Sequence, residues 1–273
     1  MTISAGPTYP PPDELARPGD PRVTWLIARR GALESLRDRM TVGYSAVFAL
    51  ALPFLVVLVA IRPQASHGDA GTALGALMAT YLLVVGMMPS TSAVSVASGM
   101  FAGEKEQGNL APLLATPASN RAIFAGKVLG AVLPPLLYAL IAETSYLVDI
   151  ALLLGPGTLR LLPAALSLAM VVLVPTYAIL GAAVASLISS RVRTYQGAQT
   201  VSSLVLLPVM AVLFGLAFAL QKQGPGLLVL TVVAMIALDT ALILLGAARW
   251  RREEVMAHHP PRASRRVVRR RDR

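Results

Sequence analysis

Six long apolar blocks constrain the fold of this chain more than any other feature. They occupy residues 41–61, 72–101, 121–154, 159–188, 198–220 and 227–248. In the bilayer core every backbone N–H and C=O group needs a partner within the protein, so apolar blocks of about 20 residues are helices that span a membrane. A membrane β-barrel would instead need alternating segments of about ten residues, which the sequence lacks. The sequence, in which 55% of the residues are hydrophobic, therefore predicts an all-α, polytopic membrane protein with six transmembrane helices.

The regions outside the blocks divide the rest of the chain. Residues 1–20 are rich in proline and poor in apolar residues, as is typical of a disordered tail. Residues 21–40 predict an interfacial amphipathic helix, with Trp25 suited to the headgroup level. Its apolar residues at helical spacing are Val23, Leu26, Ile27, Leu33, Leu36 and Met40. We therefore expect a tail at 1–20, this helix at 21–40, a six-helix transmembrane domain at 41–248 and a basic tail at 249–273.

The basic residues predict the orientation of the helices. The net charge is +10, and of the 24 Lys and Arg residues only Arg62, Arg160 and Lys222 fall on one side of the predicted bundle. By the positive-inside rule the other side is cytoplasmic, and it includes both termini and the polar interval between the second and third blocks. A basic run directly after a membrane span indicates a topology determinant that contacts anionic lipid, so we expect no nucleic-acid partner.

Three blocks are longer than a bilayer requires. About 30 residues of helix reach roughly 45 Å, against a hydrocarbon core of about 30 Å. Proline removes a backbone donor and clashes with the preceding turn, so we expect kinks within these blocks. The prolines concerned are Pro89, Pro134, Pro135, Pro163 and Pro175.

Acidic residues within the blocks are candidates for a substrate path. Glu143 and Asp239 lie deep in the third and sixth blocks, where an ionisable side chain is costly and usually faces protein or a water-filled cavity. A structural acid hydrogen-bonded to a neighbouring hydroxyl remains the alternative for both. Asp149 is expected nearer the headgroup region. Glu143 and Asp149 are six residues apart, so one helix face does not carry both.

Catalytic motifs are absent from the sequence. It contains no phosphate-binding G-x-x-x-x-G-K-[ST] loop, no H-E-x-x-H pair and no G-x-S-x-G elbow. It also has no cysteine, and we expect His258 and His259 to be solvated and not to bind a metal. We expect no catalytic, cofactor-binding or metal-binding residues in this chain, which is therefore not expected to be an enzyme.

The polar interval 103–127, GEKEQGNLAPLLATPASNRAIFAGK, holds the most specific pattern. Gly108 can break the chain direction and Asn109 can cap a short helix. Leu110, Leu113 and Leu114 then share one apolar face with no membrane to enter. Such a face needs either a groove on a partner or the cytoplasmic ends of this same subunit. Ser119 is expected to cap the third block.

This interval resembles the cytoplasmic loop after the second transmembrane helix of ABC-2 type permeases. The residues that keep the family pattern in register are Gly103, Glu104, Lys105, Glu106, Gly108, Leu110, Leu113, Leu114, Thr116, Pro117, Ser119, Ile123, Gly126 and Lys127. The sequence departs from the pattern at Asn109 and Ala111, where the family commonly has Thr and Glu. Within the family it looks most like the sodium-exporter-type branch.

The resemblance implies a permease subunit of an ATP-binding cassette exporter in a bacterial or archaeal plasma membrane. Such a subunit works with a second permease subunit, identical or related, and with separate ATPase subunits that bind ATP and Mg. The loop would be a coupling helix docked on the ATPase. The coupling residues carried over are Glu104, Glu106, Gly108, Leu110, Leu113, Leu114, Thr116 and Pro117. The substrate stays undetermined among sodium, an amphiphile, a lipid and a peptide.

Two other functions remain open at this point. Glu143 and Asp239 suit an ion- or proton-coupled secondary transporter, and the chain also suits a non-transport membrane assembly protein. Many ABC-2 permeases carry re-entrant helices between the fifth and sixth spans. Residues 221–226 leave little room for them, unless the fifth block breaks at Pro208.

Overall fold

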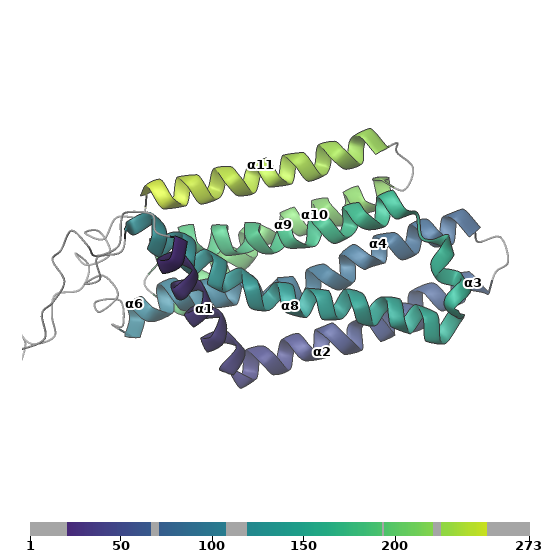
Figure 1. Ribbon diagram of the computed structural model, residues 1–273, viewed down its shortest axis with the longest axis horizontal. Helices are drawn as coiled ribbons and strands as arrows, with labels where there is room; N and C mark the ends of the chain where they lie inside the picture. The colour runs from purple at the N-terminus through teal and green to yellow at the C-terminus, as the bar shows by residue number, and fades with distance from the viewer. Residues whose placement is uncertain (1–20, 67–70, 108–118, 193, 221–224, 250–273) are drawn as a thin grey trace, which may run out of the picture.

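The computed structural model describes residues 21–66, 71–107, 119–192, 194–220 and 225–249. The regular secondary structure of these residues consists of helices joined by short turns, and six segments are long and apolar enough to cross a membrane. They are Arg39–Ala65, Gly71–Gln107, Asn120–Leu154, Ala164–Ser189, Tyr195–Ala219 and Gly226–Ala248. Figure 1 shows them side by side along one long axis. The predicted all-α bundle of six membrane-spanning helices is confirmed.

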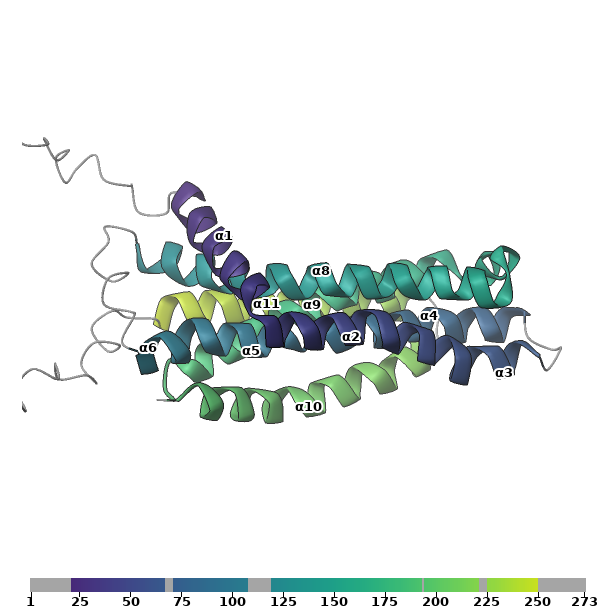
Figure 2. The ribbon, with the colours of Figure 1, turned by 90° about the horizontal axis from the view of Figure 1, so that it is seen from below.

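Helix α1 (Pro21–Arg37) lies across one end of the bundle (Figure 2). It ends before the predicted boundary at residue 40, because Asp38 caps the next helix, α2 (Arg39–Val56). The Asp38 carboxylate accepts hydrogen bonds from the Met40 N–H (3.2 Å) and from the Thr41 hydroxyl (2.5 Å). The bond from Thr41 above all lowers the pKa of Asp38 below its usual value. Met40 therefore belongs to the first span.

The second span is a chain of short helical pieces. They are α4 (Gly71–Ser90), α5 (Ser92–Ser98), the π turn η3 (Gly99–Gly103) and α6 (Glu104–Gln107). The irregularity expected at Pro89 falls at Thr91, between α4 and α5. Pro89 offers no N–H to the preceding turn, and the hydroxyls of Ser90, Thr91 and Ser92 bond to nearby carbonyls instead. The first span likewise passes through a π turn, η2 (Val57–Ile61), into α3 (Arg62–Ala65).

The third span is the uninterrupted helix α8 (Asn120–Leu154). The Ser119 hydroxyl accepts a hydrogen bond from the Ala122 N–H at 3.1 Å, which confirms the predicted cap. Pro134 and Pro135 lie inside α8 without ending it. The Tyr146 hydroxyl joins α8 to α4 by donating to the Met78 carbonyl at 3.0 Å.

The predicted start of the fourth span is wrong. Residues from 159 lie in a 3-10 turn, η4 (Pro156–Leu161), and α9 begins only at Ala164 and runs to Ser189. Pro163 is the residue before this helix and not a kink within it. Proline disfavours helical geometry in the preceding residue, and Leu162 is extended (φ −65°, ψ 118°).

The last two spans are α10 (Tyr195–Leu220) and α11 (Pro225–Arg249). Helix α10 continues through Pro208, so the fifth span does not break there. Only residues 221–224 separate α10 from α11.

Burial separates a central group of helices from a peripheral one. In the most hydrophobic 18-residue stretch of each helix, 67% of the residues are buried in α8 and 61% in α9, against 22% in α10 and in α11. Large side chains such as Tyr146, Phe124 and Leu173 fill the centre. Leucines and valines of α2, α10 and α11 are exposed at the periphery, as the surface of a membrane protein in contact with lipid requires.

Candidate functional site

The end of the bundle that carries α1 and α6 also holds the start of α8 and the end of α11 (Figure 1). The predicted coupling helix falls between α6 and α8, at residues 108–118, which lie outside the described residues. Six of the predicted coupling residues lie outside with it: Gly108, Leu110, Leu113, Leu114, Thr116 and Pro117. Glu104 and Glu106 are described, and both are on α6.

Glu104 forms an ion pair with Lys127 of α8. The Lys127 Nζ lies 2.5 Å from Glu104 Oε2 and donates to the Met100 carbonyl, also at 2.5 Å. It lies 5.2 Å from the centroid of the Phe101 ring. The Lys127 side chain is 3% exposed, and a buried cation needs such partners to offset its lost hydration. This pair joins the α6 end of the second span to the start of the third.

The next two charges on α6 contact two further helices. The Lys105 Nζ lies 3.4 Å from the carbonyl oxygen of Ser190, at the end of α9. The Tyr195 N–H, at the start of α10, donates to Glu106 Oε2 at 2.9 Å. The Tyr195 hydroxyl is also hydrogen-bonded to Ser95 Oγ at 2.7 Å. Three consecutive charged residues therefore contact α8, α9 and α10 in turn.

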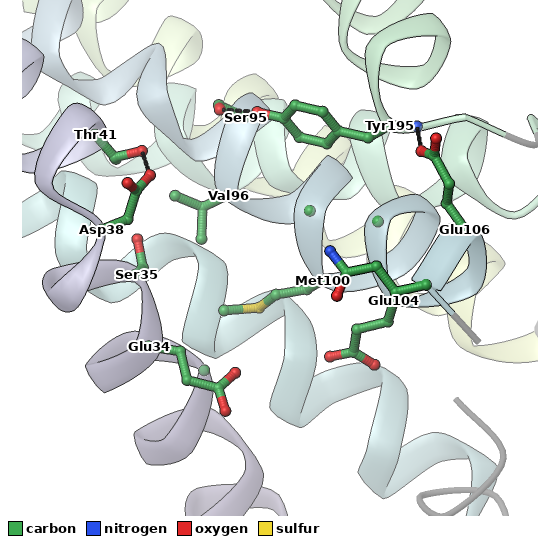
Figure 3. Close-up of a pocket in the computed structure, with 14 residues that line it drawn as sticks. Glu34, Ser35, Asp38, Thr41, Ser95, Val96, Met100, Glu104, Glu106 and Tyr195 are labelled. Carbon is green, nitrogen blue, oxygen red and sulfur yellow. Dashed lines mark hydrogen bonds between the residues drawn. The ribbon is translucent and has the colours of Figure 1, made fainter. Parts of the chain in front are cut away.

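An open pocket of about 630 Å³ lies between α1, the end of the second span and the start of α10. Among the described residues its lining includes four carboxylates, Glu34, Asp38, Glu104 and Glu106, and no lysine or arginine. Figure 3 shows Glu34 and Glu104 approaching the pocket from different helices, and Tyr195 reaching across to Ser95. Two of these carboxylates are in ion pairs with cations beside the pocket, Glu34 with Arg30 and Glu104 with Lys127.

The two intramembrane acids are buried but lie in separate places. Glu143 is 7% exposed on α8, and Asp239 is 4% exposed on α11. Within the described part of the chain, Glu143 Oε1 and both carboxylate oxygens of Asp239 have no hydrogen-bond partner. The two acids therefore do not form a hydrogen-bonded pair. Asp149, half-buried near the end of α8, accepts a long hydrogen bond (3.5 Å) from Ser145.

Several residues of this site were not among the predicted site residues. Lys105 and Lys127 belong to the polar interval, but their partners lie 85 and 23 positions away in the sequence. Ser190 contacts α6 through its carbonyl oxygen and Tyr195 through its N–H group, and such backbone contacts have no residue pattern that a sequence could reveal.

Comparison with known proteins identified one family. The model of the family described as ABC-2 family transporter protein matches residues 25–251. The match takes in all six spans, most of α1 and the whole polar interval. No curated protein matches the sequence.

Proposed function

The chain belongs to the ABC-2 transporter family, and from this membership we propose that it is the permease subunit of an ATP-binding cassette exporter. ATP hydrolysis by separate ATPase subunits drives the export, and a second permease subunit completes the membrane pathway. The observation that carries the proposal is the family match together with six spans of sufficient length. ATP and Mg bind to the partner ATPase, where the catalysis takes place.

The free energy of ATP hydrolysis reaches this subunit through the polar interval 103–127, at residues 108–118 between α6 and α8. Its two ends are joined by the Glu104–Lys127 ion pair, so a force on residues 108–118 acts on the second and third spans together. The Leu110, Leu113 and Leu114 face docks on the ATPase. Glu104 and Glu106 have partners within this subunit, and we assign them to transmission of the movement and not to contact with the ATPase.

The chain lies in the plasma membrane of a bacterial or archaeal cell with both termini in the cytoplasm. Support comes from the many basic residues that the sequence carries around α1 and after α11. Helix α1 and the C-terminal end of α11 lie at the same end of the bundle as α6 (Figure 2). The exposed face of α1, with Trp25, Leu26 and Leu33, then lies at the membrane surface.

The test replaces Leu113 and Leu114 together by glutamate in the full-length chain. We expect loss of a copurifying ATPase that has a phosphate-binding loop, because carboxylates do not enter an apolar groove. Copurification is measured by mass spectrometry of the complex extracted from native membranes, and its ATP hydrolysis is assayed. Leu161→Glu, at the opposite end of the bundle, is the matched control.

Unchanged copurification and ATP hydrolysis in the double variant would place the ATPase contact elsewhere. If no ATPase accompanies even the unaltered chain, the exporter proposal fails, and a secondary transporter or a non-transport membrane role replaces it.

A further inference from the structure

We infer that Lys105 and Glu106 clamp the α9–α10 turn to the end of the second span by stabilising two helix ends of opposite polarity. Ser190 is the C-cap residue directly after α9, and its carbonyl oxygen faces the Lys105 ammonium group. Tyr195 is the first residue of α10, and its N–H bonds to the Glu106 carboxylate.

The signs of these charges match the helix ends. The last turn of a helix leaves carbonyl oxygens unpaired and carries partial negative charge, whereas the first turn leaves N–H groups unpaired and carries partial positive charge. Along the chain the end of α9 is followed by the start of α10, and along α6 a cation is followed by an anion. Each charge therefore faces the helix end that favours it.

The contacts on α10 are divided between a local and a distant residue. The Thr194 hydroxyl accepts a hydrogen bond from the Gly197 N–H at 3.2 Å, as a local helix cap does. Glu106 serves a different group, the Tyr195 N–H, from 89 positions away. The Glu106 contact is tertiary, because it joins α10 to α6, whereas Thr194 caps α10 from the residue directly before that helix.

Two further features hold Tyr195 against the second span. A Cβ atom on Gly99 would lie 3.8 Å from Tyr195 Cε2, so the ring packs at van der Waals distance over the π turn η3. The hydroxyl at the far end of the ring bonds to Ser95 (Figure 3).

Lys105 is only 7% exposed, and weak solvent screening strengthens its interaction with the end of α9.

The mechanical part of this inference rests on the proposed function. Residues 108–118 follow α6 directly, so a displacement of that interval by the ATPase moves α6. Through Glu104 the movement reaches α8, and through Lys105 and Glu106 it reaches the ends of α9 and α10. Spans two to five then move together at their cytoplasmic ends.

The experiment measures a distance across the clamp in the full-length chain. The sequence has no cysteine, so Gln107→Cys and Gln196→Cys, both at exposed positions, provide two unique sites for nitroxide labels. Pulsed electron paramagnetic resonance in lipid nanodiscs gives the distance distribution without any ATPase. We expect one narrow distribution for the chain with its native Lys105 and Glu106.

The decisive variant exchanges the two charges, Lys105→Glu together with Glu106→Lys. We expect a longer and broader distribution, because each reversed charge faces a helix end of its own sign; the clamped population should fall by about two- to fivefold per charge. Lys105→Arg with Glu106→Asp keeps both signs and should keep the narrow distribution. An unchanged distribution in the exchanged variant overturns the clamp.

Two single variants cover the case in which the exchanged chain fails to reach the membrane. Glu106→Gln keeps an acceptor oxygen and loses the charge, whereas Glu106→Ala loses both. We expect increasing width from the native residue to Gln to Ala, and equal widths in all three overturn the clamp.

Failure of the clamp and failure of the proposed function give different results. The labelled chain alone tests the clamp, whatever the chain transports. Adding the copurified ATPase with ATP and vanadate tests transmission, and the distance between positions 107 and 196 should stay constant. A large change on ATP binding overturns transmission, whereas absence of any ATPase overturns the exporter and leaves the clamp standing.

Discussion

Gly86 of α4 lies where this helix packs against α8 and α9. A Cβ atom at this position would lie 2.6 Å from Val174 Cγ2 and 2.7 Å from Glu143 Oε1. Both distances are shorter than real Cβ contacts allow. The absent side chain therefore makes room for the buried carboxyl group of Glu143, and this explains at the level of single residues how an acid fits between three packed helices.

Gly86→Ala is expected to destabilise the bundle by about 1–3 kcal/mol, since the added methyl group overpacks a tight interface. Unfolding of the purified protein in a detergent titration measures the loss. Gly215→Ala in α10 is the matched control, because no atom lies within 4 Å of its added Cβ; there we expect a neutral or slightly stabilising effect. Equal stability of the two variants would mean that Glu143 or Val174 moves aside without cost.

Small residues of α1 approach α8 most closely, and several large residues of α1 are exposed. A Cβ atom on Gly130 would lie 2.8 Å from the Ala28 carbonyl oxygen, and one on Gly126 would lie 2.8 Å from the Thr24 carbonyl oxygen. The two backbones therefore approach closely, as helices do where glycines recur at four-residue spacing. Trp25 and Leu26 are exposed on α1, whereas Val23 and Ile27 are partly buried and pack against the core beside the small residues.

Gly130→Val is expected to undock α1, because the neighbouring atoms belong to the backbone and do not yield as a flexible side chain would. The cost should again be about 1–3 kcal/mol, and hydrogen exchange of the α1 amides should accelerate while that of α9 stays unchanged. Gly43→Val, where the added Cβ meets nothing within 4 Å, is the control. Unaltered exchange in α1 would show that other contacts hold this helix.

At the scale of the whole molecule, the bundle has two ends, which the basic residues of the sequence distinguish. The turn η4 and helix α3 lie at one end, and α1 and α6 lie at the other (Figure 2). The family match and six spans make this a membrane transporter. Its orientation follows from the loop charges and stays a prediction.

Single cysteines in the naturally cysteine-free chain test this orientation. Gly157→Cys in η4 should react with a membrane-impermeant maleimide added outside intact cells, whereas Gln196→Cys in α10 should react only after the membrane is opened. Gly157 has open space around it, so the substitution itself should be neutral. Labelling of Gln196→Cys from outside would reverse the predicted topology.

The amino-acid sequence by itself determined the features that depend on local chemistry. Six helices follow from the length and apolarity of the blocks, because a lipid environment leaves the backbone no other partners. The Ser119 cap follows from a side chain that reaches a backbone group three residues away. The family was likewise visible in one interval of about 25 residues.

Only the tertiary structure decided which residues meet across the bundle. The 3-10 turn before Pro163 and the end of α1 at Arg37 shift boundaries that periodicity alone placed elsewhere. The sequence offered Glu143 and Asp239 as candidates for a substrate path; in the described residues Glu143 Oε1 and both Asp239 oxygens have no hydrogen-bond partner, so the two acids do not pair. Glu104, Lys105 and Glu106 were visible in the motif, but their partners on α8, α9 and α10 were not. Those partners are set by packing between helices far apart in the chain, and two of them are backbone groups that every residue carries.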